Sequence, residues 1–439
     1  MPTEQEAGAL GWYPLDNAGV LYSALQRENY SAVYRFSAWM AAPVDPAALQ
    51  RAVDSTMPRF PTLRVRIKGG VFWHYLEPNP APGPFVRPDV ANPCQPVRVK
   101  EDNGWLVRVY YYDKRVSIEI FHALSDGAGA IVFLRTLLAV YLRELGHTDI
   151  PREWDGLLDV DAPPHPEELE NAYARYATVR ARRASRGRPA YQNIGEREPF
   201  YTLNVIHGMV PLDALRAVAK TYGASVTEYL GAVLIQSIVE NQRQAAPYRQ
   251  KPVTLAVPVN LRAWFPSRTL RNFMQNLRPG IDPSLGDYTL EEIVSQVHHY
   301  MRLYNDKHRL QGVIAGNVAF QRNKLLKLVP IFLKDPVISM GYWLVGIRPF
   351  SANFTNPGTF PVPPAMEPHI TRAASTLGQS YVPRPNCTVL SYKNVLTITF
   401  AGIMREADTE RRFFRQLVRD GLRVQIESNR KEEWECPSV

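Results

Sequence analysis

A histidine and an aspartate stand four residues apart where a predicted strand gives way to a predicted helix. Apolar residues alternate from 116 to 120, which places them and His122 on one face of the strand. A near-neutral imidazole is suited to accept a hydroxyl proton at physiological pH. Asp126, followed by Gly127, can accept the free backbone N–H groups of the helix. His122 and Asp126 are therefore candidate catalytic residues; the alternative is a structural histidine beside a helix cap.

Other catalytic motifs fail on their spacing. Gly127 and Gly129 follow a strand and open a helix, as in a dinucleotide-binding loop, but Val132 occupies the third glycine position. Neither a Gly-x-Ser-x-Gly nucleophile elbow nor a Walker loop occurs. His298 and His299 are adjacent on a predicted helix and cannot share a face. We therefore expect no metal site.

The elements around His122 predict a mixed sheet with helices packed on it. A strand at 30–40 precedes a helix that Asp45 caps, and two hairpins follow before the helix at 128–145. The chain has 439 residues, which is long for one core, so we predict an α/β (α+β) fold with two lobes. The composition shifts most within 146–200. The predicted parts are a first lobe at 1–165, a basic crossover linker at 166–200 and a second lobe at 201–439.

The second lobe and the entry of the chain give further expectations. Residues 11–22 are predicted to form an irregular aromatic segment. In the second lobe the patterns predict helices at 211–220, 225–240, 289–304 and 408–428, a strand at 253–259 and a hairpin at 386–401.

Composition and charge narrow the class of protein. Hydrophobic residues make up 45% and charged residues 21%, as in a soluble globular protein. The net charge is +9, and much of the excess lies in a cluster of arginines. Such a cluster is either a solvated linker or an attraction for an anionic partner such as coenzyme A. No nucleic-acid motif accompanies it, so we expect no nucleic-acid partner. The cluster comprises Arg175, Arg180, Arg182, Arg183, Arg186 and Arg188.

Three features bear on the compartment. The widely spaced Cys94, Cys387 and Cys436 favour reduced thiols in a cytosolic protein. The acidic start lacks the apolar region of a secretory signal, which also favours a cytoplasmic location. The apolar stretch at 325–346 contains Lys334 and Pro336 among other breaks, so no membrane span is expected. Peripheral contact of that stretch with a membrane stays open.

The stretch Phe121-His122-Ala-Leu-Ser-Asp126-Gly127 resembles the HxxxDG motif of the chloramphenicol acetyltransferase-like superfamily. That superfamily includes condensation domains of peptide synthetases, plant BAHD acyltransferases and microbial alcohol O-acetyltransferases. Phe121 stands where condensation domains usually carry a second histidine, which resembles the acetyltransferase branches. The BAHD sequence Asp-Phe-Gly-Trp-Gly is absent. The opening Pro14-Leu-Asp-Asn17 is similar to bacterial alcohol O-acetyltransferase-like proteins.

The resemblance implies two similar lobes with a channel between them and roles for further residues. It implies that Arg262, at the end of Val257–Arg262, pairs with Asp126, whereas the alternative is a surface arginine. A buried carboxylate also needs a partner on physical grounds. Asn272 lies in a stretch that resembles the Gly-Asn-Phe element. Ser351 and Asn353 lie in a stretch that resembles a Ser-Asn-X-Gly turn, and with Asn272 they are candidates to bind substrate or the oxyanion.

The function implied is an acyl-CoA-dependent O-acyltransferase that acetylates a small alcohol directly. His122 would be the general base, Asp126 would orient the site, and Gly127 and Arg262 would be structural. The implied co-substrate is acetyl-CoA or another acyl-CoA, with no bound cofactor. One alternative takes the acyl group from a carrier protein. An alternative of another class is an inactive binding scaffold with the same fold.

Overall fold

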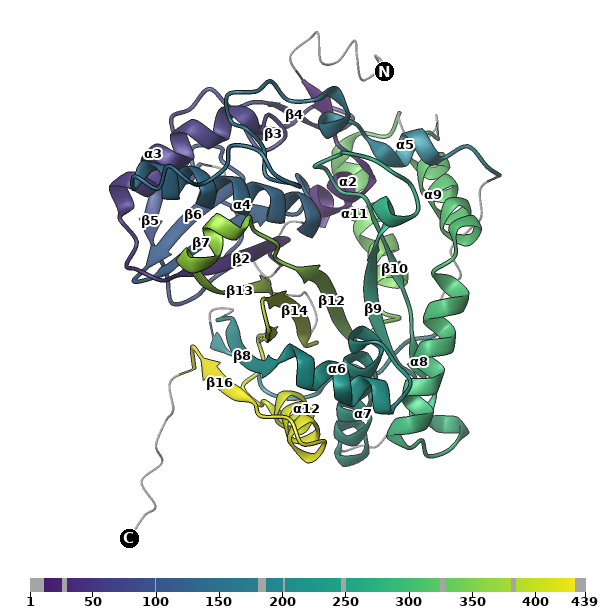
Figure 1. The fold of residues 1–439 in the computed structure, drawn as a ribbon. Coiled ribbons are helices and arrows are strands. Elements are labelled where there is room, and N and C mark those ends of the chain that lie inside the picture. The colour runs from purple at the N-terminus through teal and green to yellow at the C-terminus, as the bar shows by residue number, and fades with distance from the viewer. Residues whose placement is uncertain are drawn as a thin grey trace.

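The computed structural model describes residues 12–25, 30–98, 100–180, 187–199, 202–245, 250–323, 328–379 and 384–430. The start of the chain, Cys436 and the arginines 182, 183 and 186 of the predicted basic linker lie outside these residues. Figure 1 shows two lobes, one above the other, with strands of both meeting near the centre.

The upper lobe is built on a five-stranded sheet in which the hairpin before His122 is central. Its order is β13-β2-β7-β6-β5. Helices α3 (Pro46–Thr56) and α4 (Gly127–Glu144) share one hydrophobic core with this sheet. Both predicted elements, the hairpin and the helix, are present. The strands are β2 (Val33–Met40), β5 (Val86–Pro88), β6 (Val107–Tyr112), β7 (Arg115–Phe121) and β13 (Ile370–Leu377).

The lower lobe is built on a larger mixed sheet in the order β10-β9-β12-β14-β15-β8-β16, with β11 paired to β9. Strand β12 runs parallel to β9 and β14, whereas β15 is antiparallel to its neighbours. Helices α6, α7, α8 and α12 pack on it. The strands are β8 (Asn204–Pro211), β9 (Val253–Asn260), β10 (Met274–Leu277), β11 (Gly280–Ile281), β12 (Ala352–Thr359), β14 (Asn386–Tyr392), β15 (Val395–Gly402) and β16 (Gln425–Ser428). The helices are α6 (Leu212–Thr221), α7 (Val226–Gln244), α8 (Leu290–Tyr304) and α12 (Asp408–Arg419).

Shorter elements connect and cover the lobes. A small sheet contains β1 (Tyr13–Pro14), β4 (His74–Pro78) and β3 (Val65–Gly69). The remaining α-helices among the described residues are α2 (Asn17–Leu25), α5 (Ala172–Tyr176), α9 (Lys307–Gln321) and α11 (Ile331–Tyr342), and α11 continues into a π-helical turn at Trp343–Ile347. Together the two sheets and their helices confirm the predicted two-lobed mixed fold. No described helix is both long enough and apolar enough to cross a bilayer.

Three predicted elements were wrong. The entry segment is helical from Asn17, because the Asp16 carboxylate accepts the Gly19 N–H at the start of α2. The last helix ends at Arg419, because Gly421 takes a positive φ of 86°, and the predicted remainder contains the edge strand β16. The stretch Ser351–Gly358 is mostly strand β12 rather than a turn, with a register shift between Thr355 and Gly358.

Strand β13 links the two lobes. It belongs to the residues predicted for the second lobe, yet it pairs antiparallel with β2 and forms the edge of the first sheet. In Figure 1 it lies at the junction, beside β14. The boundary within 166–200 stays a prediction.

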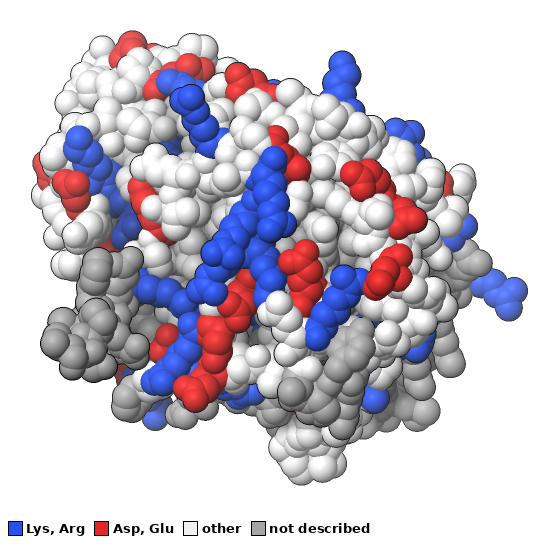
Figure 2. Space-filling model, turned by 90° about the horizontal axis from the view of Figure 1, so that it is seen from below, with Lys and Arg blue, Asp and Glu red and all other residues white. Residues whose placement is uncertain are grey.

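Lys and Arg side chains gather in a band on the lower face, with acidic side chains along it (Figure 2). The bottom of Figure 1 carries α12, whose exposed arginines are Arg411, Arg415 and Arg419. The visible charge is therefore mixed in sign over much of this face, as on an ordinary solvated surface.

Candidate active site

His122 lies immediately after β7, at the wall of a cavity between the two lobes. Its backbone N–H donates to the Ala32 carbonyl at 2.7 Å, which extends the pairing of β7 with the chain before β2 by one residue. The cavity has a volume of about 210 Å³. Residues of both lobes line it, among them His122, Asp126, Gly127, Tyr22 and Tyr34 on one side and Pro258, Asn260, Asn353, Asn356 and Asn386 on the other. A cavity therefore lies between the two lobes, where the resemblance implied a channel.

Asn272 fixes the tautomer of His122. Its Nδ2 donates to the His122 carbonyl at 2.9 Å and lies 3.4 Å from Oδ2 of the buried Asp16. This orientation turns Oδ1 toward His122 Nδ1, 3.1 Å away. Because the amide oxygen can only accept, Nδ1 carries the proton and Nε2 keeps a free lone pair. Asn272 was predicted to bind substrate or the oxyanion, but its amide contacts the ring and the carbonyl of His122, and it is absent from the described cavity lining.

Burial lowers the pKa of His122 below its usual 6.5, and the nearby Asp126 carboxylate, Asn272 and Asp16 offset part of that effect. The imidazole is therefore mainly neutral at pH 7, which is the form that a general base requires.

Two tyrosines hold the imidazole ring. Tyr22 of α2 stacks on its face, with ring centroids 4.4 Å apart and planes 20° apart. Tyr34 of β2 meets it edge to face at 4.8 Å. The Tyr34 hydroxyl donates to the backbone carbonyls of Ser125 and Asp126, so it also fixes the turn that follows the histidine. The ring plane is thus set from two sides.

Asp126 is buried and accepts hydrogen bonds on both carboxylate oxygens. Oδ1 accepts the N–H groups of Ala128 and Gly129 and so caps α4. Oδ2 accepts the Phe273 N–H at 2.8 Å and faces Arg262 Nη1 at 2.8 Å. The expected ion pair between Asp126 and Arg262 is therefore formed, and the helix cap is formed with it.

Arg262 joins the two lobes through this pair. Nη2 donates to the carbonyls of Thr269 and Arg271 at 2.9 and 2.7 Å, and Nε donates to Thr269 at 3.2 Å. The side chain is 15% exposed. A planar guanidinium with five donors suits this combination of one carboxylate and two carbonyls. The turn after His122 is thereby held against the loop after β9.

Arg271 stands where the resembled element commonly has glycine, and the structure explains why. Its Nη2 donates to the Pro14 carbonyl at 2.7 Å, and its Nε lies 3.7 Å from Asp16 Oδ2. Burial raises the pKa of Asp16, and Arg271 opposes that effect. The arginine therefore compensates a buried carboxylate that itself lies beside Asn272.

The remaining predicted residues differ in their access to the cavity. Asn353 lines it, and its Nδ2 donates to Asn386 Oδ1 at 2.6 Å. Ser351 is buried, is absent from the described lining, and its hydroxyl accepts the Thr254 N–H. Gly127 lines the cavity, and a Cβ added to it would make only ordinary van der Waals contacts. Among the described residues, no group of three or more potential metal ligands occurs.

Sequence reasoning missed Asp16, Tyr22 and Tyr34 at the site. Asp16 directly precedes α2, and an aspartate before a helix is a usable N-cap signal. The tyrosines carried no comparable local signal, because each reaches His122 from a separate element.

Comparisons with known proteins agree with the fold. No protein-family model matches the chain, and no curated protein matches it by sequence. Solved structures do match. Polyketide synthase associated protein 5 from Mycobacterium tuberculosis is 15% identical, with a TM-score of 0.62 over 92% of this chain and 96% of that one. The first condensation domain of the CDA synthetase is 15% identical, with a TM-score of 0.56 over 93% and 96%.

A third match is a mutant of the starter condensation domain of rhizomide synthetase RzmA, solved in complex with C8-CoA and Leu-SNAC. It is 15% identical, with a TM-score of 0.57 over 94% of this chain and 95% of that one. At these identities the likeness shows the fold alone: the chain has the two-lobed fold of condensation domains.

Proposed function

We propose that this protein is an acyl-CoA-dependent O-acyltransferase, of the alcohol O-acetyltransferase type, that uses His122 as its general base. The observation that carries the proposal is the half-buried imidazole whose Nδ1 faces Asn272 Oδ1, which leaves Nε2 as the basic nitrogen of a residue that lines the cavity. The Asp126–Arg262 pair supports the same reading, because it fixes the turn that follows the base.

In the proposed reaction the acceptor hydroxyl gives its proton to His122 Nε2 while its oxygen attacks the thioester carbonyl carbon. A carbon–oxygen bond forms, and the tetrahedral oxyanion then collapses with breakage of the carbon–sulfur bond. The imidazolium returns the proton to the departing thiolate, so the products are an ester and free coenzyme A. No acyl-enzyme is formed.

The oxyanion needs a hydrogen-bond donor. We assign this contact to Asn353, because its amide lines the cavity, whereas the Ser351 hydroxyl is buried against Thr254. Several amides and hydroxyls also line the cavity among apolar side chains, which supports a small hydroxyl-bearing acceptor. These side chains are Asn260, Asn276, Asn356, Asn386, Thr355, Thr376 and Thr388.

The decisive experiment is a screen of alcohols and amines with acetyl-CoA, read as release of free thiol. We expect release with an alcohol, and His122→Ala should lower kcat/KM by roughly 100-fold or more while the thermal midpoint stays unchanged. An alanine variant with near wild-type rates would contradict the role of His122 as the general base.

A second candidate donor is an acylated carrier protein, which the fold likeness to condensation domains of synthetases favours. Presenting the same acyl group on free coenzyme A and on a carrier separates the two donors. His122-dependent transfer from the carrier alone would replace the coenzyme A proposal. If neither donor gives His122-dependent transfer, the inactive scaffold remains.

A further inference from the structure

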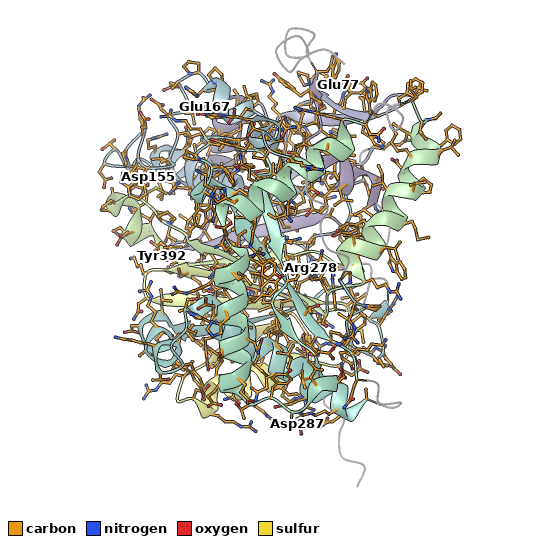
Figure 3. All side chains as sticks on the ribbon, turned by 90° about the vertical axis from the view of Figure 1, so that its right-hand side faces the viewer. Glu77, Asp155, Glu167, Arg278, Asp287 and Tyr392 are labelled. Carbon is orange, nitrogen blue, oxygen red and sulfur yellow. The ribbon has the colours of Figure 1, made fainter. Side chains whose placement is uncertain are left out.

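Helix α11 is apolar around most of its circumference, yet none of its described residues is buried. At the right-hand edge of Figure 3 it stands at the surface with side chains directed outward. Phe332, Val337 and Met340 are 74%, 65% and 60% exposed. A helix that is apolar around most of its circumference is normally covered, so this surface is a candidate binding site. We call it the docking face: Val71, Phe72, Leu328, Phe332, Leu333, Val337, Met340, Trp343 and Leu344, all of them exposed.

The inner side of α11 is already fixed to the protein. The Ile331 N–H donates to the Val71 carbonyl at 2.9 Å, and the Ser339 hydroxyl donates to the Ala24 carbonyl of α2 at 3.1 Å. Asp335, the acidic residue of the helix, lies 3.1 Å from His74 Nε2. The helix therefore presents its outer side to the surroundings as a fixed surface. Its inner side also supplies Tyr342 to the wall of the active-site cavity.

The chemistry of the docking face distinguishes between kinds of partner. Among its side chains only the Trp343 indole can donate a hydrogen bond. Protein interfaces usually carry about one hydrogen bond per 100–200 Å². Hydrocarbon chains form no hydrogen bonds, so the composition of the docking face suits a lipid layer better than a protein groove.

Two cation–tryptophan pairs lie at the docking face, as at a membrane–water interface. Lys334 Nζ lies 5.8 Å from the Trp73 ring centroid, and the Arg348 guanidinium carbon lies 5.5 Å from that of Trp343. Tryptophan prefers the headgroup level, and the long basic side chains keep their charge in water while their stems follow apolar surface. Both flanking charges are positive, which favours anionic headgroups.

We propose that the docking face binds the surface of an anionic lipid bilayer. The helix lies in the interface rather than across it, because its 12 residues are too few to span the hydrocarbon core. Binding combines burial of the apolar side chains with attraction of Lys334 and Arg348 to the headgroups. The inference is independent of the proposed acyl transfer.

The test is flotation of the full-length protein with vesicles made of equal parts phosphatidylcholine and phosphatidylglycerol. We expect binding, with weaker binding to pure phosphatidylcholine and to the mixed vesicles in high salt. The combined variant Phe332→Ser, Val337→Ser and Met340→Ser should reduce binding at least about tenfold. Exposed apolar residues outside the docking face provide the matched control, Leu285→Ser, Val418→Ser and Ile426→Ser, which should bind like the wild type.

Failure of the wild type to bind the mixed vesicles, or equal binding by the docking-face variant, would overturn the proposal. Sedimentation in solution tests a second copy of the chain as the occupant. The membrane proposal is also overturned if the wild type is a dimer that does not bind vesicles and the docking-face variant is a monomer. His122→Ala should bind vesicles like the wild type, so this result separates failure of docking from failure of the proposed chemistry.

Discussion

At the scale of single residues, the surroundings of His122 favour one protonation state. The Asn272 amide orients Nδ1–H, Tyr22 and Tyr34 fix the ring plane, and burial opposes the imidazolium. Each contact reaches the histidine from a different part of the chain. Tertiary packing thus sets the protonation state and orientation of the base. Only the histidine and the turn that follows it belong to one continuous stretch of sequence.

The lowered pKa of His122 predicts the pH dependence of activity. An imidazolium cannot accept the hydroxyl proton, so activity should be lost as the pH falls through the pKa of the folded enzyme. That pKa lies below 6.5, so kcat/KM should fall to half only below pH 6.5. A pH–rate profile with saturating acyl donor measures this limb. A midpoint at or above pH 7 would contradict the assignment of His122 as a buried neutral base.

Truncation of Asp126 should differ from truncation of His122. Asp126→Ala removes the cap of α4 and leaves the Arg262 guanidinium without its carboxylate. Loss of one partner of a buried pair typically costs about 3–5 kcal/mol. We expect Asp126→Ala to lower both activity and the denaturant midpoint, and His122→Ala to lower activity alone. Equal stability of the two variants would show that the ion pair contributes little.

At the scale of elements, the start of α4 depends on a glycine that is not part of the resembled motif. A Cβ on Gly129 would lie 2.3 Å from the Leu270 carbonyl oxygen, whereas one on Gly127 would meet nothing nearer than 3.5 Å, at Phe36. The helix therefore approaches the loop of the other lobe at Gly129.

Gly129→Ala should destabilise the protein by about 1–3 kcal/mol through overpacking against Leu270. Gly127→Ala is the matched control and should change stability by no more than about 0.5 kcal/mol. Thermal unfolding of the two variants beside the wild type makes the comparison. Similar losses in both would mean that the approach of α4 to Leu270 tolerates a methyl group.

The strand, turn and helix around His122 were predictable because alternation, a capping aspartate and helical spacing are local patterns. The pairing of Arg262 with Asp126 was predictable only through the resemblance, with the cost of an unpaired buried carboxylate in support. Helix α2 was missed because the aromatic residues of the segment at 11–22 suggested no period, and the role of Tyr22 depends on a stack across the fold. Asn272 was predicted to bind substrate or the oxyanion, and its contacts with the His122 ring and carbonyl could not be predicted because side-chain direction is set by tertiary packing.

At the scale of the whole molecule, Glu168 in the segment after the first lobe connects that lobe to the loop behind His122. Arg59 and Glu168 form two hydrogen bonds of 2.6 and 2.8 Å, with both side chains nearly buried. The Glu168 carbonyl also accepts the Leu270 N–H. One residue of the predicted linker thus contacts the first lobe by its side chain and the loop behind His122 by its backbone.

Glu168→Ala should destabilise the protein by about 3–5 kcal/mol, because it leaves the Arg59 guanidinium buried without a carboxylate. Glu167→Ala, which breaks only an exposed pair with Arg175, should cost no more than about 1 kcal/mol. Urea unfolding followed by tryptophan fluorescence compares them. A Glu168 variant as stable as the Glu167 variant would show that the Arg59–Glu168 pair does not stabilise the protein.

The position of β13 also sets the order in which the protein can be completed during its synthesis. The upper sheet lacks one edge until the ribosome has produced the chain as far as Leu377, because β13 is the neighbour of β2. Until then β2 offers unpaired backbone groups, which are a template for pairing with other chains. The first lobe therefore stays incomplete while most of the second is synthesised, and it cannot be cut away as an independent unit with its sheet intact.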